Sequence, residues 1–413
     1  MNPIKAIMIG AGQRGKAYAV HALSHPGDLT FIGVAEPHQE RRTQFAEKYN
    51  IDTANCLHTW EDVFTREKWA DAVFICTPDD MHYEPVMAAI EQGYDVLLEK
   101  PISPSPQECK DVAAAAEAKG VKVVVCHVMR YTPFCVAMKQ VIESGEIGKI
   151  TTIVHNENVG HLHHSHSFTR GNWRNTAESS PMILQKSCHD MDMLQWLVGK
   201  KCLRLSSFGS LTYFNKDNCP KEAPPRCTDG CPVDCPYDTR KLYMTDNEWF
   251  RSVAAGHAGP TDEEVMTALK TGPYGRCVFQ CDNDVVDHQT VNMEFEDGIT
   301  VIFSMSSFTP EISRSIKIMG TKGQIKGHTS HDKIVVTSFL TGEDREIDIS
   351  EAEGGHGGGD NGIMRAFCDY LRGKDVPDIS HAQISAKNHL LCFAAEESRH
   401  NKGAVIEMEA YGE

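Results

Sequence analysis

The stretch LQKSCHDMDML, residues 184–194, brings several reactive side chains close together. Lysine and histidine can transfer protons or stabilise a developing negative charge near neutral pH. If residues 185–198 form one helix, Gln185, Lys186 and His189 are neighbours on one face and can converge on one ligand. We therefore take Lys186 and His189 as candidate catalytic residues. The alternatives are a hydrogen-bonded core histidine at position 189 and a lysine outside the chemistry at position 186.

A different face of the same expected helix carries Cys188, Met191, Gln195 and Val198. This stripe is mostly apolar and can pack on a sheet. Cys188 is therefore predicted to be a core thiol.

A glycine-rich turn lies near the start of the chain. KAIMIGAGQRGKAYAVHAL reads as a strand, a turn and a helix, and Gly10, Gly12 and Gly15 give the spacing G-x-G-x-x-G. These glycines permit a tight turn, close approach to a pyrophosphate, and close packing of helix on strand. The backbone amides of Gln13 and Arg14, at the helix N-terminus, would then face the phosphates.

A second strand, TFIGVAE, ends at Glu36. Dinucleotide-binding units place at this point the acid that binds the adenosine ribose hydroxyls, which favours NAD over NADP. Arg41 and Arg42 follow closely and would accept a 2′-phosphate if they folded back. A solvated acid at the end of a strand is the remaining alternative for Glu36.

Further strand-like runs, DAVFICT, DVLLEK and VKVVVCH, alternate with helical segments near 82–92 and 106–119. Nearly continuous apolar strands between helices indicate a buried parallel sheet. We expect an α/β domain, a doubly wound parallel sheet of the Rossmann type, over residues 1–128.

The run TPDDMHYEPVMAAIEQGYDVLLEKPIS resembles the signature of the glucose-fructose oxidoreductase and inositol dehydrogenase family, Gfo/Idh/MocA. MRYTPFCVAMKQVIESGEIGKI is similar to that family's crossover into its second domain. The resemblance covers most of the chain, and its E-K-P element is much more specific than the glycines. It implies that Lys100 reaches both the nicotinamide and the substrate; the alternative is a surface lysine at a strand end. The other positions it assigns to the cofactor site are Thr77, Pro78, His82 and Glu99.

In the family resembled, a helix beginning D-x-x-x-H carries an acid and a histidine that orient and deprotonate a sugar hydroxyl. His189 matches the histidine, but Gln185 occupies the place of the acid. A glutamine can orient a hydroxyl but cannot accept its proton. Lys186 or Lys100 would then share the acid/base work.

Beyond residue 150 the pattern changes to longer alternating strands with hairpin signals. HQTVNMEFEDGITVIFSMSSF alternates on both sides of Asp297-Gly298, a strong turn dipeptide, and SIKIMGTKGQIKG and KIVVTSFLTGEDREIDIS indicate two more hairpins. We expect residues 129–413 to form an α+β domain with a large, mainly antiparallel open sheet, as in the family resembled. Its uncovered face would join copies into a homodimer or homotetramer.

The segment GHLHHSHSFTRGNWRNT offers groups suited to sugar binding, because indole stacks on pyranose C–H surfaces and arginine binds hydroxyls or anions. Its close histidines, with no nearby acid, are a poor metal site. Arg174 is the preferred anchor, with a surface charge as the alternative. The full expected substrate-binding set is Arg130, Tyr131, His166, Asn172, Trp173, Arg174 and Gln185.

A cysteine-rich insertion is expected at residues 215–240. The segment is rich in proline and lacks apolar periodicity, so burial of side chains is not expected to order it. A cross-link that fastens the segment is therefore an attractive explanation for its cysteines. Four thiolates could close a structural zinc site. Free thiols, a disulfide or an iron–sulfur cluster remain open, since the spacing is not the usual paired C-x2-C. The four candidate ligands are Cys219, Cys227, Cys231 and Cys235.

The length and net charge of the chain limit the expected number of domains and the kinds of partner. At 413 residues it exceeds the roughly 250 to 300 at which single cores stop growing, so two domains are expected. A net charge of -16 opposes binding to nucleic acid. No signal-peptide pattern or apolar run long enough to span a membrane is evident, and we expect a cytoplasmic location.

The resemblance implies an NAD-dependent oxidoreductase that oxidises a secondary hydroxyl, at C3 in the expected case, of a sugar, glycoside or cyclitol. Relatives also cleave glycosides by a redox-neutral route: oxidation at C3, elimination, hydration and return of the hydride. The third hypothesis is a non-catalytic sugar or NAD sensor, in which Gln185 marks lost chemistry.

Overall fold

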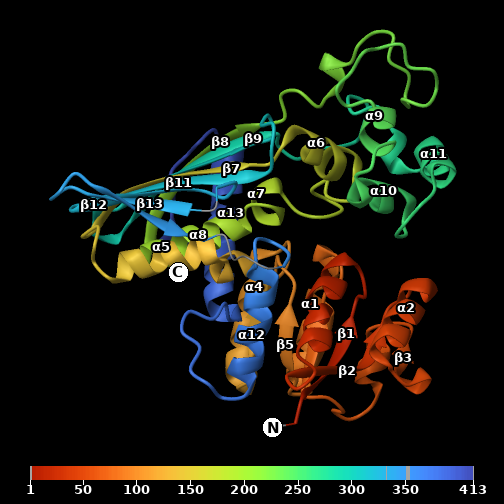
Figure 1. The fold of residues 1–413 in the computed structure, drawn as a ribbon, viewed down its shortest axis with the longest axis horizontal. Helices are drawn as coiled ribbons and strands as arrows, with labels where there is room; N and C mark the ends of the chain where they lie inside the picture. Colours follow the sequence, from red (N-terminus) through yellow and green to blue (C-terminus); the bar gives the residue numbers. More distant parts are fainter. Residues whose placement is uncertain (1, 332, 350–353, 413) are drawn as a thin grey trace.

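The computed structural model describes residues 2–331, 333–349 and 354–412. Outside these ranges lie residues 1 and 413, which are the ends of the expected domains. Ser350, at the end of the last expected hairpin, also lies outside them. The strands of the described residues form two sheets, one below the other in Figure 1, with helices between them.

The first sheet is six-stranded and parallel, with the strand order 3-2-1-4-5-6. This is the doubly wound order expected of a Rossmann domain. The strands are β1 (Ile4–Ile9), β2 (Leu29–Ala35), β3 (Cys56–Leu57), β4 (Ala72–Ile75), β5 (Asp95–Leu98) and β6 (Val123–Val125). Its helices are α1 (Gln13–Ser24), α2 (Gln39–Tyr49), α3 (Tyr83–Glu91) and α4 (Pro106–Lys119).

Local sequence explains where these elements begin and end. Strand β4 is buried along its whole length, as in a sheet covered on both faces. Helix α4 begins with Ser105, whose side chain accepts the amide of Glu108, and has Pro106 at its first position. It ends at Gly120, whose φ of 66° is the left-handed conformation that glycine adopts without strain.

The second sheet is nine-stranded, with the order 14-13-12-11-7-10-9-8-15. Its strand pairs are antiparallel except β7 with β10. The expected hairpin at Asp297-Gly298 joins β9 to β10, and both residues have positive φ. The strands are β7 (Ile150–Asn158), β8 (Cys202–Ser210), β9 (His288–Phe295), β10 (Thr300–Ser306), β11 (Ser313–Gly320), β12 (Gly323–His328), β13 (Lys333–Ser338), β14 (Asp344–Asp348) and β15 (Ile406–Glu407).

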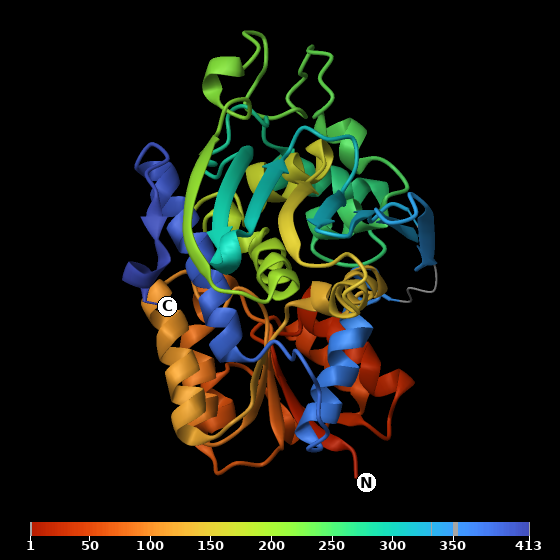
Figure 2. The same cartoon turned by 90° about the vertical axis from the view of Figure 1, so that its left-hand side faces the viewer.

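Helices pack between the two sheets on one face of the second sheet (Figures 1 and 2). They are α5 (Pro133–Glu143), α7 (Met182–Gln185), α8 (Cys188–Val198) and α13 (Ala382–His400), with α14 (Met408–Tyr411) near the C-terminus. Cys188 and Met191 of α8 are fully buried, as the apolar stripe predicts. The fold is therefore the expected combination of a Rossmann domain and an α+β domain with a mainly antiparallel sheet.

Helix α12 (Gly359–Leu371) returns from the second part of the chain to the first sheet. Its residues Ile363 and Phe367 share a core with Phe74 of β4, and the ring centroids of Phe74 and Phe367 lie 5.5 Å apart. The N-cap of this helix is Gly358, and Asp360 lies in its first turn. The glycine loop before α12 is thus fixed beside the first domain.

The helix expected over residues 185–198 is broken. Helix α7 ends at Gln185 and α8 begins at Cys188. In one continuous helix the carbonyl of Gln185 would accept the amide of His189, but this carbonyl accepts a hydrogen bond from Nζ of Lys100 at 2.6 Å. Lys100, from the first domain, therefore occupies the Gln185 carbonyl that a continuous helix would need for its own hydrogen bond.

Residues between β8 and β9 form a separate helical lobe, at the upper right of Figure 1. Its helices are α9 (Thr239–Tyr243), α10 (Glu248–Ala255) and α11 (Asp262–Thr271), and it packs against α6 (His161–His164) and the π-helical turn Ser165–Arg170. No helix among the described residues is both long and apolar enough to cross a membrane.

Candidate active site between the two sheets

The glycine turn after β1 is built for close approach. Gly10 has a φ of +88°, and a Cβ there would lie 2.7 Å from the carbonyl oxygen of Cys76. A Cβ on Gly15 would lie 2.4 Å from the carbonyl oxygen of Gly10. At Gly12 a Cβ would meet nothing within 4 Å. Gly10 and Gly15 therefore hold the turn against its own domain, while Gly12 faces open space at the N-terminus of α1, where a pyrophosphate fits.

Glu36 lies beside this turn and is only 5% exposed. Its carboxylate accepts the amides of Ala11 at 2.9 Å and His38 at 3.0 Å. Arg42 donates to the carbonyl oxygens of Glu36 and Pro37, so its guanidinium is engaged by the main chain. An acid at the end of β2 and an arginine already occupied fit the ribose hydroxyls of NAD better than a 2′-phosphate.

The loops after β4 and β5 are joined by His82. One ring nitrogen of His82 lies 2.6 Å from the carbonyl oxygen of Pro101, and the other lies 2.9 Å from that of Thr77. Thr77 in turn donates its hydroxyl to the carbonyl of Met81. Through these contacts His82 and Thr77 hold the Lys100-Pro101 segment in place, and Pro78 precedes the turn that they stabilise.

Glu99 is buried and faces the start of helix α1, next to the glycine turn after β1. Its carboxylate lies 2.7 Å from Nε of Arg14, accepts the hydroxyl of Tyr18 at 2.9 Å, and accepts the amide of Lys100 at 2.5 Å. Burial alone would raise the pKa of Glu99, but the charges of Arg14 and Lys100 outweigh it and lower this pKa. Glu99 is thus a charged residue that orients its neighbours.

Lys100 and His189 come from different domains to the same place. Lys100 extends from the end of β5 to the Gln185 carbonyl, and His189 is the second residue of α8. His189 is 7% exposed, and its Nδ1 has no hydrogen-bond partner among the described residues. Burial, followed by the nearby charge of Lys100, holds the pKa of His189 well below 6.5. It is therefore neutral at physiological pH, the form in which a histidine accepts a proton.

Lys186 is directed into a second polar cluster under the sheet. Its Nζ lies 3.3 Å from Glu157 of β7, which also pairs with Arg314 of β11 at 2.8 Å. Arg314 pairs further with Asp190 at 2.8 Å. Lys186 thus balances a fully buried acid, while the Gln185 side chain is 3% exposed and its main chain binds Lys100.

Two residues of the crossover are engaged in structural contacts. Arg130 is 3% exposed and forms a two-pronged ion pair with Asp192 of α8, at 2.6 and 2.7 Å. The hydroxyl of Tyr131 lies 3.2 Å from that of Ser380. These contacts tie the crossover to α8 and to the segment before α13.

The remaining expected substrate residues lie toward the helical lobe. The ring of His166 is 2.7 Å from the hydroxyl of Tyr243. Trp173 stacks on Phe168 with ring centroids 5.7 Å apart, and Asn172 is exposed. Arg174 makes a two-pronged contact with Asp282 at 2.8 and 2.9 Å. In this structure Arg174 therefore fastens its own loop.

The glycine loop before α12 adds a group that the sequence did not single out. The ring centroids of His356 and His189 lie 6.1 Å apart. Nδ1 of His356 is 3.1 Å from Asp360, and Arg14 pairs with Asp360 at 2.8 Å. The spacing H-x-x-x-D at the start of a helix was the available signal.

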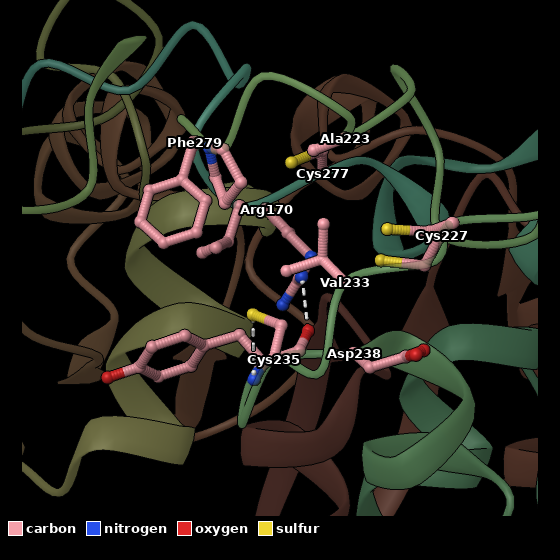
Figure 3. A pocket seen from close by; sticks show the side chains of 12 residues that line it. Arg170, Ala223, Cys227, Val233, Cys235, Asp238, Cys277 and Phe279 are labelled. Atoms are coloured by element: carbon pink, nitrogen blue, oxygen red, sulfur yellow. Dashed lines mark hydrogen bonds between the residues drawn. The ribbon is translucent and has the colours of Figure 1, made fainter. Parts of the chain in front are cut away.

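The expected zinc site finds no support. Among the residues that the structure describes, no three His, Cys, Asp or Glu side chains are grouped to hold a metal ion. Cys227, Cys231, Cys235 and Cys277 instead line a cavity of about 20 Å³ together with Arg170. Figure 3 shows the Arg170 side chain among Cys227, Cys235 and Cys277. Cys219 does not line it, and the thiols are free. A buried cation in the middle of these thiols disfavours a second cation.

The insertion is ordered by burial and hydrogen bonds, contrary to the expectation that it could not be. Phe214, Tyr237 and Phe279 form a small core of their own. Arg170 is fully buried and donates to the carbonyls of Arg276 at 2.8 Å and Tyr237 at 2.7 Å. The aromatic residues that create this core are spread over residues 214–279, which hid it from a local pattern.

Family models match both halves of the chain. The model described as "Oxidoreductase family, NAD-binding Rossmann fold" matches residues 4–127, and that described as "Oxidoreductase family, C-terminal alpha/beta domain" matches residues 139–406. These matches follow the two sheets.

Individual proteins are also similar to this chain. "Putative oxidoreductase YteT" of Bacillus subtilis (strain 168) is 26% identical over 367 residues, which cover 84% of this chain and 83% of the relative. The 2,7-anhydro-N-acetylneuraminate hydratase of Mediterraneibacter gnavus is 28% identical over 48% of this chain and 50% of its own length. The solved structure of an inositol dehydrogenase homolog from Azotobacter vinelandii, complexed with NAD+, has a TM-score of 0.72 at 15% identity, covering 98% of this chain and 97% of that one.

Proposed function

The chain belongs to the Gfo/Idh/MocA family of oxidoreductases, and from this premise we propose that it oxidises a secondary hydroxyl of a sugar, glycoside or cyclitol, at C3 of a pyranoside, with NAD as cofactor. The observation that carries the proposal is the meeting of Lys100 and His189 beside the glycine turn. A bound nicotinamide supplies the hydride acceptor.

The residues of this chain handle the proton and the charge. His189, neutral because it is buried, takes the proton of the hydroxyl. The Lys100 ammonium, held by the Gln185 carbonyl, stabilises the negative charge that develops on the oxygen. Gly12, Glu36 and the N-terminus of α1 provide the surfaces that hold the dinucleotide. Lys186 supports the site through Glu157, and its position favours an indirect role.

The test is absorbance at 340 nm together with product analysis, using purified protein, NAD and a panel of free sugars, cyclitols and glycosides. We expect NADH to accumulate with a ketone product for at least one member. Growth of absorbance at 340 nm with NADP, as NADPH, but not with NAD would overturn the cofactor choice. No reaction and no hydride exchange with any member of the panel would overturn the proposal.

A second candidate function is the redox-neutral route, in which a glycoside is cleaved or an anhydro bond is opened without net NADH. Its support is the similarity to the 2,7-anhydro-N-acetylneuraminate hydratase and the presence of a second histidine 6.1 Å from the first. Release of the aglycone without an increase in absorbance at 340 nm would distinguish this route in the same assay.

We also propose that the outer face of the nine-stranded sheet joins copies into a homodimer or homotetramer in the cytoplasm. Ile302 of β10 and Phe208 of β8 are 42% and 56% exposed on this face. Exposed apolar groups on a wide sheet favour association. Light scattering on the protein as it elutes from a size-exclusion column measures its mass. The mass of a monomer would contradict this proposal.

A further inference from the structure

His127 lies beside the proposed base without a hydrogen-bond partner of its own. It follows β6 and is 0% exposed, and neither of its ring nitrogens makes a hydrogen bond to any residue that the structure describes. A buried polar group without a partner lowers stability, and nearly all such groups in native proteins are paired. An unpaired imidazole at this place therefore points to a partner that it gains during function.

His189 carries the complementary group. Its Nδ1 is also buried and has no hydrogen-bond partner within the described part of the chain. The rings of His127 and His189 lie edge to face, with centroids 6.0 Å apart and an interplanar angle of 82°. Hydrogen bonds between catalytic groups are often long before substrate binds and tighten only in the complex. The two imidazoles are placed for such a contact.

A buried carboxylate lies next to the same imidazole. Nε2 of His127 is 3.8 Å from Oδ1 of Asp192, which is 0% exposed. Arg130 holds this carboxylate at 2.6 and 2.7 Å, and Asn388 donates to it at 2.5 Å. Burial alone would raise the pKa of Asp192, but the charge of Arg130 outweighs burial, so the carboxylate stays charged. It is a fixed acceptor for a proton of His127.

The other neighbours of His127 are already occupied. The ring of His389 is 5.4 Å away, but its Nδ1 lies 2.6 Å from the carbonyl oxygen of Ser385 and its Nε2 accepts the amide of Ile102 at 3.1 Å. The remaining charged groups that act on His127 are bound to other residues, and they are Lys100, Arg130 and Glu99. His189 is thus the neighbour that has a nitrogen to share.

His127 is itself neutral. Burial lowers its pKa to about 4, and the nearby charge of Asp192 does not compensate. A neutral imidazole has one nitrogen that donates and one that accepts. His127 can therefore accept the proton on Nδ1 of His189 with one nitrogen and donate to Asp192 with the other.

We propose that His127 orients His189 during the reaction, by accepting a hydrogen bond from its Nδ1–H while donating to Asp192. The inference rests on the proposed function. The contact fixes the tautomer of His189 in which Nε2 is unprotonated and free to take the proton of the hydroxyl. Once Nε2 has taken this proton, His127 and Asp192 stabilise the imidazolium. His127 does not touch the substrate, so it is a positioning residue.

Two substitutions separate packing from hydrogen bonding. His127→Phe keeps a ring and removes both nitrogens, whereas His127→Gln loses the ring and keeps a donor and an acceptor. Steady-state kinetics with NAD and the substrate found in the assay above gives kcat and KM. We expect kcat of His127→Phe to fall about 10²-fold, the lower end of what a positioned acid or base contributes, with KM within about twofold of wild type. His127→Gln should be at least about tenfold more active than His127→Phe, because it keeps both hydrogen bonds.

Stability gives a second readout that a structural role would move in the opposite direction. His127→Phe removes two unpaired buried nitrogens, so its Tm should equal or exceed that of wild type although its kcat falls. His21→Phe is the matched control. His21 is 2% exposed, its Nε2 has no hydrogen-bond partner among the described residues, and it lies 3.6 Å from Asp28 in the last turn of α1. This variant should leave kcat unchanged.

The outcomes separate this inference from the proposed function. A kcat of His127→Phe within threefold of wild type, or a His127→Gln that is no more active than His127→Phe, would overturn the role of His127 and leave the oxidation standing. If His127→Phe does not fold, His127→Gln decides, and a loss of more than tenfold in its kcat would count against the proposal. A wild type that neither forms NADH nor exchanges hydride would overturn the oxidation and, with it, this role.

Discussion

At the scale of single residues, the site depends on charges held at close range. Lys100 donates to one carbonyl at 2.6 Å and lies near His189, and that histidine is kept neutral by burial and by this lysine. In the proposed mechanism one cation therefore both keeps the base unprotonated and faces the oxygen on which charge develops.

Replacing Lys100 by Met should keep the length of the side chain and remove its charge. We expect kcat to fall by about 10²- to 10³-fold, the loss typical of a removed transition-state hydrogen-bond donor. Steady-state kinetics on the preferred substrate measures this, with Lys110→Met as the control, since Lys110 binds the Tyr411 carbonyl away from the site. A fall of less than threefold would show that Lys100 has no part in the chemistry.

At the scale of elements, a helix break, a glycine loop and a helical lobe shape the site. The break between α7 and α8 frees the Gln185 carbonyl for Lys100, and the glycine loop brings His356 to His189. The lobe is anchored by Arg170, whose guanidinium is surrounded by carbonyl acceptors from the insertion and its neighbours.

Arg170→Met should release this lobe while leaving the first sheet folded. It would leave buried carbonyls unsatisfied, at about 1 to 3 kcal/mol for each. We expect a lower Tm and new proteolytic cleavage within residues 215–240, detected by limited proteolysis and mass spectrometry. Arg204→Met, which removes an exposed pair with Glu294, is the matched control and should change neither. An unaltered cleavage pattern in Arg170→Met would mean that the lobe is held by other contacts.

At the scale of the whole molecule, buried histidines couple stability to pH. Burial lowers the pKa of His127 and His164 to about 4, and of His166 and His389 to about 3. Unfolded, each would titrate near 6.5. Between pH 6.5 and about 4 the unfolded chain therefore binds protons that the native protein does not, so stability falls as pH falls.

Each histidine should contribute a slope of about 1.4 kcal/mol per pH unit below its unfolded pKa. We expect Tm to drop steeply between pH 6.5 and 5 and to change little between pH 7 and 8, measured by calorimetry in buffers of matched ionic strength. His389→Gln should flatten the slope, even if it lowers Tm at pH 7.5. A Tm that is constant from pH 7.5 to 5 would contradict this coupling.

Local patterns predicted most of the fold. Buried apolar runs such as DVLLEK became parallel strands, and Asp297-Gly298 became the turn of an antiparallel hairpin. The glycine spacing and Glu36 indicated the nucleotide turn. Their success has one physical reason: the alternation of side chains along a strand and the conformation of a turn depend on residues a few positions apart.

The prediction of one helix over residues 185–198 was wrong, and the zinc prediction found no support. At both places residues distant in the sequence determine the local structure. Nothing near Gln185 in the sequence shows that Lys100 will take its carbonyl, and nothing near Cys227 shows that Arg170 will lie among the thiols. The roles expected for Arg130 and Arg174 stay predictions, and both side chains are engaged by acids that the sequence did not connect to them.

The two sheets, the nucleotide turn and the family's lysine and histidine could thus be predicted without a structure, because they follow from short-range spacing. Which charges meet depends on the three-dimensional packing. The pairs of His189 with His356, Lys186 with Glu157 and Arg14 with Asp360 join segments far apart in the chain or separated by a helix break. Such contacts depend on how the two sheets pack, and that packing sets the burial and the neighbouring charges that give each group its chemistry.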